Sequence, residues 1–460
     1  MKLIFWILFS ILFFSCQEED TIISEDNSQD YFITYKEYTL DSLSGNVTNS
    51  EINVHDFQSA QECKECHLQH YEEWEASFHA HAFNDELFFS MWESEKEDRP
   101  ITGVNYCVQC HAPAAFVSGY DLDGIDFTNV ETLPSSIHEG VSCDICHTMV
   151  DKSPSVHTQD HVAAVAKYYL NPGENIKFGS NQSPDSNSFH QSEYLPLFNS
   201  SSSCLPCHNQ SIRGMPLEMT FSEWDDHAGL SMAGPSCQKC HMPKESNGHS
   251  SHYFAGVDAL FYNGVDESSP QYQQIKAILE ETVDISFSRV NTQDGSLDSI
   301  KVLNDTLYIP ITVNNLAGHR FPSGTAFARE GWLELLVFNS QGDTIYSKGV
   351  IENSTELLDY NDEELMFYTQ ILYDQENHGG NITNSASNAY SYKDYTIPTL
   401  FYDAKTYKIA MHEDFNSNII IKAKMNFRAF KPQIINEFHP QSISNIPIME
   451  MDSDSCYINF

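Results

Sequence analysis

The residue pattern Cys-x-x-Cys-His occurs five times in this chain of 460 residues. In each copy the two intervening residues place both thiols on one short turn, with the His ring beside them. Two such thiols can add to the two vinyl groups of a porphyrin while the His binds its iron, so the pattern predicts attachment of c-type haem. Zinc is the alternative, but paired Cys ligands of zinc do not require a following His. The predicted cofactors are therefore five covalently bound haem c groups. The predicted haem-binding thiols are Cys63, Cys66, Cys107, Cys110, Cys143, Cys146, Cys204, Cys207, Cys237 and Cys240, and the predicted iron-binding histidines are His67, His111, His147, His208 and His241.

Each iron has a second face, and the ligand there decides between conduction and chemistry. A second His fills the coordination sphere and suits electron transfer, whereas an open face can bind a substrate. Of the 20 His residues, fifteen lie outside the five patterns, and eleven of these lie between His55 and His252. This supply is enough to cap all five irons and favours electron transfer.

The segment after the first pattern carries two candidates for a second ligand. Tyr71, Trp74 and Phe78 have helical spacing and predict an apolar stripe that faces porphyrin. His81 lies nearly on this stripe and His79 flanks it, so periodicity alone favours His81.

The same segment resembles a known family. Cys-x-x-Cys-His followed by Tyr-x-x-Trp-x-x-Ser-x-His-Ala resembles the opening of multihaem cytochromes related to the tetrahaem electron carrier of ammonia oxidisers, within the hydroxylamine oxidoreductase and pentahaem nitrite reductase assemblage. Gly140 to Cys143 and Ser236 to Pro243 match it further. In that pattern the His of Ser-x-His-Ala is an axial ligand. The resemblance therefore implies His79 and ranks it above His81.

Other histidines are candidates on weaker grounds. His252, after the last pattern, and His190, in a loop before the fourth, look like ligands of the same family. His138 directly precedes the third pattern, and His157 and His161 lie four residues apart on a possible helical turn. In the C-terminal half of the chain, the segment from Gly318 to Gly324 resembles part of a C-terminal module of some of these cytochromes. Its His319 is either a ligand that reaches back to a haem or a packing residue at the joint. The candidate second ligands from the first half are His79, His252, His190, His138, His161, His157 and His81.

The N-terminus predicts export. Lys2 precedes an apolar run from Leu3 to Phe14 that is too short for a stable membrane span, so residues 1–15 are expected to be a signal peptide. Ser15-Cys16 resembles the end of a lipobox, which predicts lipidation of Cys16; ordinary cleavage near Ser15 is the alternative. An acidic run at 17–20 resembles a surface-export signal. We therefore expect a protein anchored by lipid to the outer membrane, exposed either to the periplasm or at the cell surface.

The charge balance restricts the partners. The formal net charge is −41, so the chain should repel nucleic acid and anionic headgroups and prefer redox partners with cationic docking surfaces. Oligomeric state is open on sequence grounds. The acidic run Asp121 to Asp126 weakly resembles a calcium loop, but its Gly is misplaced for an EF-hand, and a surface turn is the favoured interpretation.

The residue patterns change along the chain and predict two halves of different structure. We expect a mainly α and loop-rich multihaem domain followed by an all-β sandwich-like domain. The expected ranges are an acidic tether at 16–55, the haem domain at 56–256, a helical linker at 257–284 and the β domain at 285–460. The tether is expected to hold at most one strand, at Tyr31–Tyr35, and the helix of the linker is expected to start at Pro270. In the haem domain the porphyrins should form most of the core, and Asn171–Ser203 should lack regular structure unless haem orders it. In the β domain, strands are expected at Asp284–Val290, Thr306–Val313, Trp332–Phe338 and Asn418–Met425.

Taken together, the residues favour a non-enzymatic electron carrier. The alternative is an oxidoreductase acting on nitrite, hydroxylamine or tetrathionate, and a further one is a protomer of a cytochrome filament. The resemblance weakens the enzyme reading, because pentahaem nitrite reductases carry Lys in place of the His at their catalytic haem and all five patterns here end in His.

Overall fold

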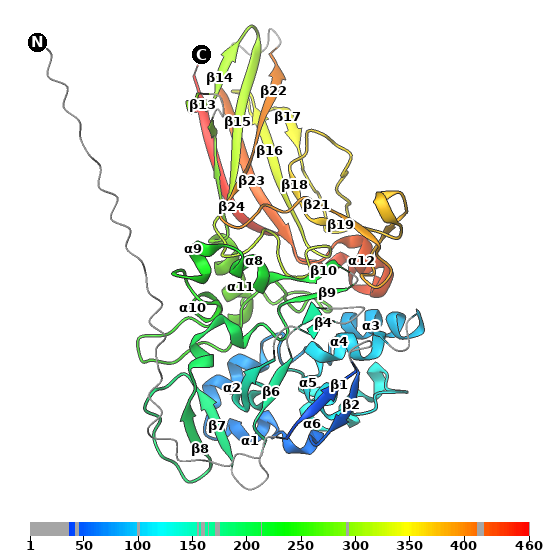
Figure 1. Cartoon of the computed structure of the whole chain (residues 1–460). Coiled ribbons are helices and arrows are strands. Elements are labelled where there is room, and N and C mark those ends of the chain that lie inside the picture. Colours follow the sequence, from blue (N-terminus) through cyan, green and yellow to red (C-terminus); the bar gives the residue numbers. More distant parts are fainter. Residues whose placement is uncertain are drawn as a thin grey trace, which may run out of the picture. The chain divides into compact units, whose positions relative to one another are not determined.

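The structure is a computed structural model, and it describes residues 36–41, 46–98, 102–153, 156–157, 162–163, 165–170, 175–212, 214–290, 294–411 and 418–459. Figure 1 shows the chain, with short helices and loops in the first half and long strands in the second. The predictions for the signal peptide, Cys16, the acidic run at 17–20, the strand at Tyr31–Tyr35 and His161 lie outside these residues. No helix in the described ranges is long and apolar enough to cross a bilayer.

The first half, from residue 36 to 256, is built from short helices, as predicted. They are η1 (Val54–Asp56), α1 (Ala60–Lys64), α2 (Leu68–Glu75), α3 (Glu86–Asp98), α4 (Thr102–His111), α5 (Pro113–Ser118), η2 (Phe127–Thr132), α6 (Ser135–His138), α7 (Cys143–His147), η3 (Pro196–Asn199), η4 (Ser201–Ser203), α8 (Thr220–Asp225), α9 (Ala228–Ser231) and α10 (Cys237–His241).

Small two-stranded sheets connect these helices. They pair β1 (Tyr38–Leu40) with β2 (Val47–Ser50), β3 (Met149–Lys152) with β6 (Ala166–Tyr168), β4 (Val156–His157) with β5 (Val162–Ala163), β7 (Ile176–Gly179) with β8 (Gln191–Tyr194), and β9 (Gln210–Ile212) with β10 (Met215–Glu218). The β7–β8 pair lies within 171–203, a segment that was expected to lack regular structure unless haem orders it. Its parallel pairing joins residues that are distant in the sequence, which local composition does not reveal.

An apolar core of protein side chains supports the first half. Phe83, Trp92, Ala112 and Ile137 are completely buried in one cluster that joins α3 to α6 and the chain before α1. Within this cluster, Phe83 just before α3 packs edge to face against Trp92 of α3, with ring centres 5.5 Å apart. Protein side chains therefore form a core of their own in this part, and the contribution expected from the porphyrins stays a prediction.

The second half begins with the predicted helix. α11 (Pro270–Glu280) starts with Ser269 as a cap that accepts a hydrogen bond from the Tyr272 amide, and Pro270 occupies the first helical position. Ile275 and Leu279 face the β module, which we define as residues 285–460 with its flanking strand β11.

Strands dominate the β module, and all four predicted strand segments are confirmed. The elements are β11 (Val283–Ser286), β12 (Ser288–Val290), β13 (Leu297–Ser299), β14 (Lys301–Leu303), β15 (Thr306–Asn315), β16 (Glu330–Phe338), β17 (Thr344–Lys348), β18 (Phe367–Tyr368), β19 (Gln370–Tyr373), η5 (Glu376–His378), β20 (Ile382–Thr383), β21 (Ser391–Asp394), β22 (Tyr402–Ala410), β23 (Ile419–Arg428), α12 (Pro432–Phe438), η7 (Pro440–Asn445) and β24 (Met449–Ile458).

Two antiparallel sheets form the centre of the β module. One joins β11, β14 and β22 to β15, and the other has the order β17-β16-β23-β24 with β18 beside β16. Alternate residues of β15, such as Ile309 and Ile311, and of β16, such as Leu335, are fully buried in one shared cluster. This alternation of buried positions is typical of two sheets packed face to face. Helix α12 shows that the module is not purely β.

Contacts within the described residues join the two halves. Arg329 of the β module pairs with both oxygens of Asp258, in the linker that directly follows the first half, and donates to the Ala429 carbonyl at 3.0 Å. His439 after α12 lies 2.7 Å from Glu86 of α3. These charge-assisted contacts hold the β module against the part of the chain that carries the Cys-x-x-Cys-His patterns.

Candidate haem sites

Each Cys-x-x-Cys-His pattern forms a tight turn, as its spacing predicts. The His67 amide donates to the Cys63 carbonyl at 2.9 Å, and the His208 amide donates to the Cys204 carbonyl at 3.0 Å. The third and fifth patterns are complete short helices, α7 and α10, and the second ends α4. Both thiols and the imidazole of a pattern therefore leave the same turn, which is the arrangement that covalent haem attachment requires.

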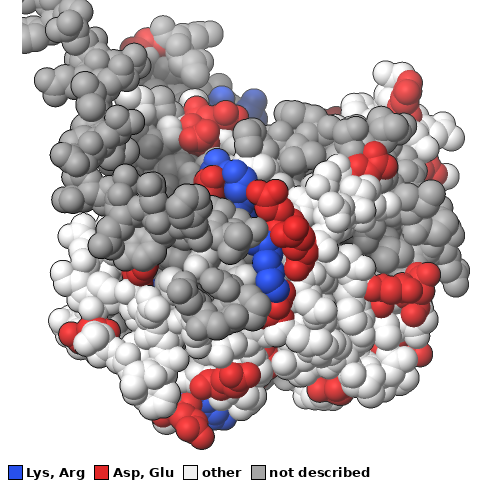
Figure 2. Space-filling model, turned by 60° about the horizontal axis from the view of Figure 1, so that its bottom comes forward, with Lys and Arg blue, Asp and Glu red and all other residues white. Residues whose placement is uncertain are grey.

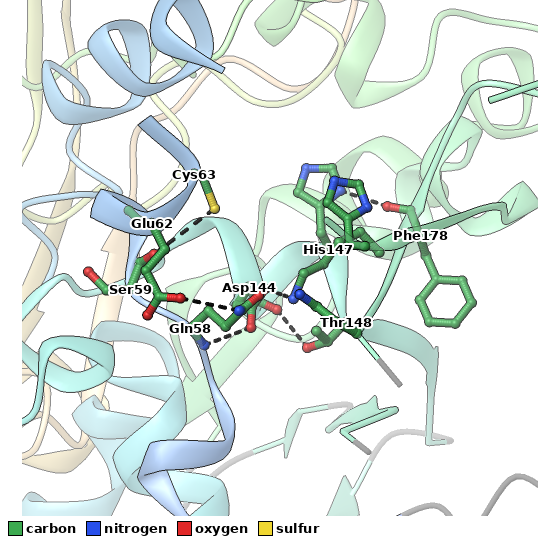
Figure 3. Close-up of polar contacts among 12 residues, drawn as sticks. Gln58, Ser59, Glu62, Cys63, Asp144, His147, Thr148 and Phe178 are labelled. Atoms are coloured by element: carbon green, nitrogen blue, oxygen red, sulfur yellow. Dashed lines mark hydrogen bonds and ion pairs between the residues drawn. The ribbon is translucent and has the colours of Figure 1, made fainter. Parts of the chain in front are cut away.

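The first and third patterns are joined by a polar network (Figure 3). Asp144 of α7 accepts from the Gln58 amide at 2.8 Å and pairs with Lys177 of β7 at 2.5 Å. The Thr148 hydroxyl donates to the Asp144 carbonyl at 2.6 Å and closes α7. Because Asp144 is almost fully buried, this network fixes the position of α7 relative to the turn that precedes α1.

Backbone carbonyls orient several of the pattern histidines. Nδ1 of His111 lies 2.5 Å from the Ala82 carbonyl, Nδ1 of His147 lies 2.6 Å from that of Phe178, and Nδ1 of His241 lies 2.7 Å from that of Ala255. A carbonyl only accepts, so each Nδ1 carries the proton and leaves Nε2 as a free lone pair. An Nδ1–H bond of this kind is the usual support of a metal-binding imidazole.

Three predicted second ligands face pattern histidines. The ring centres are 6.2 Å apart for His67 and His190, 6.4 Å apart for His208 and His79, and 6.5 Å apart for His147 and His252. A metal–nitrogen bond of about 2.0 Å, plus about 1.1 Å from nitrogen to ring centre, gives roughly 6.2 Å between the ring centres of two imidazoles on opposite sides of one ion. The residues present therefore fit a haem iron held between two histidines.

Backbone carbonyls also orient two of the predicted second ligands, His252 and His190. Nδ1 of His252 lies 2.7 Å from the Ser250 carbonyl, and Nδ1 of His190 lies 2.9 Å from the Gln191 carbonyl. Burial lowers the pKa of His79 to about 3 and, with His147 nearby, that of His252 to about 4. Both rings are therefore neutral near pH 7, and the neutral ring is the form that ligates a metal. Nδ1 of His79 is buried and has no hydrogen-bond partner within the described residues.

The geometry separates His79 from His81. Helix α2 ends at Glu75, where the Ser77 hydroxyl turns back to the Trp74 carbonyl at 2.7 Å. The helical stripe therefore does not reach His81, so the argument from periodicity is wrong. His81 instead lies 3.2 Å from the Asn84 amide oxygen. The resemblance implied His79, and the ring that faces His208 is that of His79.

The second pattern differs from the other patterns. His111 stacks on Phe88 at 3.9 Å, and the described side chains supply no imidazole at the 6.2–6.5 Å spacing seen for the pairs above. The candidates His138, His157 and His161 stay predictions: the His138 carbonyl accepts from Asn84, the His157 side chain is not described, and His161 lies outside the described residues. Strand β5 of the β4–β5 hairpin packs beside β9, whose Gln210 donates to Cys110 at 3.3 Å.

Sequence reasoning missed a buried cluster next to the third pattern. Nε2 of His249 lies 2.9 Å from both oxygens of Glu73, and Glu73 also accepts from the His252 amide at 2.7 Å. The His70 ring lies 4.8 Å from that of His252. Glu73 therefore positions the backbone of a predicted ligand, and no local sequence pattern indicates this contact.

The thiols of different patterns meet in pairs. Side-chain contacts link Cys63 with Cys143, Cys110 with Cys207, and Cys204 with Cys237. They connect the first pattern with the third, the second with the fourth, and the fourth with the fifth. Cys146 of the third pattern also lies within electrostatic range of Cys207 of the fourth. Haems attached there would be neighbours.

The calcium interpretation gains no support from local geometry. In the 121–126 segment the Asp121 carboxylate accepts from the Asp123 amide at 2.9 Å, and the Asp126 carboxylate caps η2 by accepting from the Thr128 amide at 2.8 Å. These bonds describe a surface turn. The favoured prediction for this segment therefore agrees with its contacts.

Comparisons with known proteins agree with this geometry. The family model described as "Cytochrome c554 and c-prime" matches residues 62–148. The crystal structure of a penta-heme cytochrome c552 from Thermochromatium tepidum is similar in fold, with a TM-score of 0.63, 18% sequence identity, and coverage of 88% of this chain and 99% of that chain. A search of curated proteins found no match.

The five patterns, the family match and the fold together support the class of multihaem c-type cytochromes. Haem c in this class is covalently bound, and the associated activity is electron transfer. When bound, the haem supplies a one-electron redox centre. The thiols and imidazoles described above would attach it, orient it and cap its iron.

Proposed function

We propose that this chain is a pentahaem electron conduit that carries electrons from a membrane-associated donor to a periplasmic or extracellular acceptor. The facing imidazoles are the observation that supports it most. His79, His190 and His252 come from three separate segments, yet each lies opposite a pattern histidine at ligand spacing. An iron with two His ligands has no position left for a substrate, so it exchanges electrons only.

The contacts between patterns support a continuous path. The thiol contacts and the proximity of Cys146 to Cys207 place the haem patterns in the order first, third, fourth and fifth. The second pattern contacts the fourth and forms a side branch of this path. In this proposal electrons enter and leave at the ends of that order. The acidic surroundings stabilise the oxidised haems and lower their potentials.

The charge supports a cationic redox partner. The chain has 65 acidic and 24 basic residues, and acidic side chains are the more numerous on the face shown in Figure 2. Complementary charge raises the rate of encounter with a basic docking surface. We also propose that residues 1–15 are a signal peptide and that Cys16 carries the lipid that anchors the protein to the outer membrane.

The second candidate function is an oxidoreductase for a small nitrogen or sulfur compound. The observation that favours it is the surroundings of His111, where no described imidazole lies at ligand spacing. An open iron at that pattern would provide a site for chemistry. The match at residues 62–148 supports a proposed relationship to the hydroxylamine oxidoreductase and pentahaem nitrite reductase assemblage, which includes such enzymes.

A titration of the reduced holoprotein with carbon monoxide separates the two functions. The conduit predicts no stoichiometric binding, no turnover of nitrite, hydroxylamine or tetrathionate, and rapid electron exchange with a basic electron-carrier protein. One equivalent of bound gas together with turnover of any of the three compounds would replace the conduit with the enzyme. Haem content from the pyridine haemochrome spectrum is measured on the same sample and should give five haems per chain.

A further inference from the structure

The loop between β15 and β16 of the β module reaches the fifth Cys-x-x-Cys-His pattern. His319 in this loop lies opposite His241, with ring centres 6.4 Å apart and planes inclined by 19°. This is the spacing of the three pairs in the first half of the chain, which is also that of two imidazoles on one metal ion. The two rings come from different halves of the molecule and are 78 residues apart in sequence.

A backbone carbonyl binds Nδ1 of each imidazole. Nδ1 of His319 lies 3.0 Å from the Arg320 carbonyl, and Nδ1 of His241 lies 2.7 Å from the Ala255 carbonyl. Each Nδ1 therefore holds the proton, and each Nε2 is left as a lone pair. Among the described residues, Nε2 of His319 has no hydrogen-bond partner.

The loop that carries His319 is held from the β-module side. The Asn315 side-chain amide donates to the His319 carbonyl at 2.8 Å and to the Pro398 carbonyl at 3.1 Å, and its oxygen accepts from the Ala317 amide at 2.9 Å. Asn315 is 2% exposed. Arg320 pairs with Asp394 at 2.7 Å. The backbone on both sides of His319 is thus fixed before any haem contact is considered.

The other side of the loop is held by helix α8, which lies between the fourth and fifth patterns. Glu223 of α8 accepts from the Arg320 amide at 3.1 Å and from the Ser323 hydroxyl at 2.5 Å. Gly324 closes the loop with a φ of +75°, and a Cβ there would lie 3.0 Å from Glu218. This position therefore favours glycine on both conformational and steric grounds.

We propose that His319 is the second axial ligand of the iron bound at Cys237–His241, so that the β module completes the last haem site. The inference rests on the proposed function, because it assumes haem at that pattern. It assigns the β module a direct part in the conduit: the module sets the spin state and the potential of the terminal iron, in addition to packing against the first half.

The test is the His319→Ala variant of the holoprotein, with His378→Ala as the matched control. His378 is an exposed histidine of the same module. We expect His319→Ala to retain its full haem content, to show one additional high-spin ferric haem by electron paramagnetic resonance, and to bind one more equivalent of carbon monoxide than the wild type. His378→Ala should match the wild type. Unchanged spin state and gas binding in a fully loaded His319→Ala protein would overturn the proposal.

A second variant keeps the test decisive if the alanine protein does not fold. His319→Met retains a side chain that can ligate iron, and a His–Met haem has a higher potential than a bis-His haem. We expect one of the haems to titrate at a higher potential, with the others unchanged. Five unshifted potentials would refute the assignment. The test compares each variant with the wild type. An open iron at the second pattern, or fewer than five haems in the wild type, would therefore contradict the proposed function but would not change the result for His319.

Discussion

At the scale of single residues, position in space distinguishes ligands from other histidines. His79 and His81 are two residues apart and have similar sequence surroundings. Only the ring of His79 faces a pattern histidine, because the chain leaves the helix after Glu75. Helical periodicity was extended to His81, six residues past the last residue of α2, and local sequence contains no clear signal for that helix end.

Replacement of His79 provides a direct check on this distinction. His79→Ala removes the imidazole opposite His208 and should convert one low-spin haem to a high-spin haem that binds carbon monoxide. His81→Ala is the control and should leave the electron paramagnetic resonance spectrum unchanged. If His81→Ala produced the high-spin signal and His79→Ala did not, the assignment would be reversed.

Lys431 gives the β module a defined pH dependence. Burial lowers the pKa of Lys431 from 10.5 to about 8, and its Nζ donates to the Gln370 carbonyl at 2.8 Å. In the unfolded chain the amine keeps its proton to about pH 10.4. The unfolded state therefore binds more protons between pH 8 and 10.5, and the free energy of unfolding contributed by this group rises with pH in that window.

The Lys431→Met variant isolates this contribution. Between pH 8 and 10.5 the free energy of unfolding of the wild type should increase relative to the variant, by at most roughly 3 kcal/mol for a shift of this size. Guanidinium unfolding of both proteins at a series of pH values measures the difference. A difference that is flat with pH, or that falls, would show that Lys431 keeps its proton in the folded protein.

At the scale of elements, segments with strong local patterns were predictable. The Cys-x-x-Cys-His turns, helix α11 and the strands β15, β16 and β23 follow from spacing, capping and alternation. Elements that depend on distant partners were not predictable: the parallel β7–β8 pair, helix α12 and the apolar core around Trp92. The contact of Glu73 with His249 joins positions 176 residues apart, so no local pattern encodes it.

The loop between β15 and β16 should depend on Asn315. Asn315→Ala removes the amide that bridges three carbonyls, one of them in a buried position, and leaves the half-buried Ala317 amide without this acceptor, at a cost of about 1–3 kcal/mol. Hydrogen exchange of peptides spanning 316–322 should accelerate. Asn314→Ala is the control, because Asn314 bonds to Asp284 in an exposed position. Equal exchange in the two variants would show that Asn315 does not hold the loop.

At the scale of the whole molecule, the halves function as one unit. The contact of His439 with Glu86 and the contacts of Glu223 with the β15–β16 loop cross the joint between them. The two-part organisation was visible in the sequence, because residue texture changes after about residue 256. The contacts across the joint were not, since they involve single polar residues without a local pattern.

Attachment to a membrane is a separate prediction for the whole chain. Cys16→Ser should move the protein from the membrane fraction to the soluble fraction of its native host, because lipidation requires the thiol. Cys456→Ser replaces the other cysteine outside the haem patterns and should leave the distribution unchanged. Membrane retention of Cys16→Ser protein would argue against a lipid anchor.

The central claim is that the irons are capped on both faces and serve conduction. Low-temperature electron paramagnetic resonance of the fully oxidised holoprotein tests it most directly, because low-spin and high-spin ferric haems give separate signals whose intensities count the irons. The conduit predicts five low-spin haems per chain and no high-spin signal. A high-spin signal that integrates to one iron per chain in the wild type would contradict it and would point to an open iron at His111.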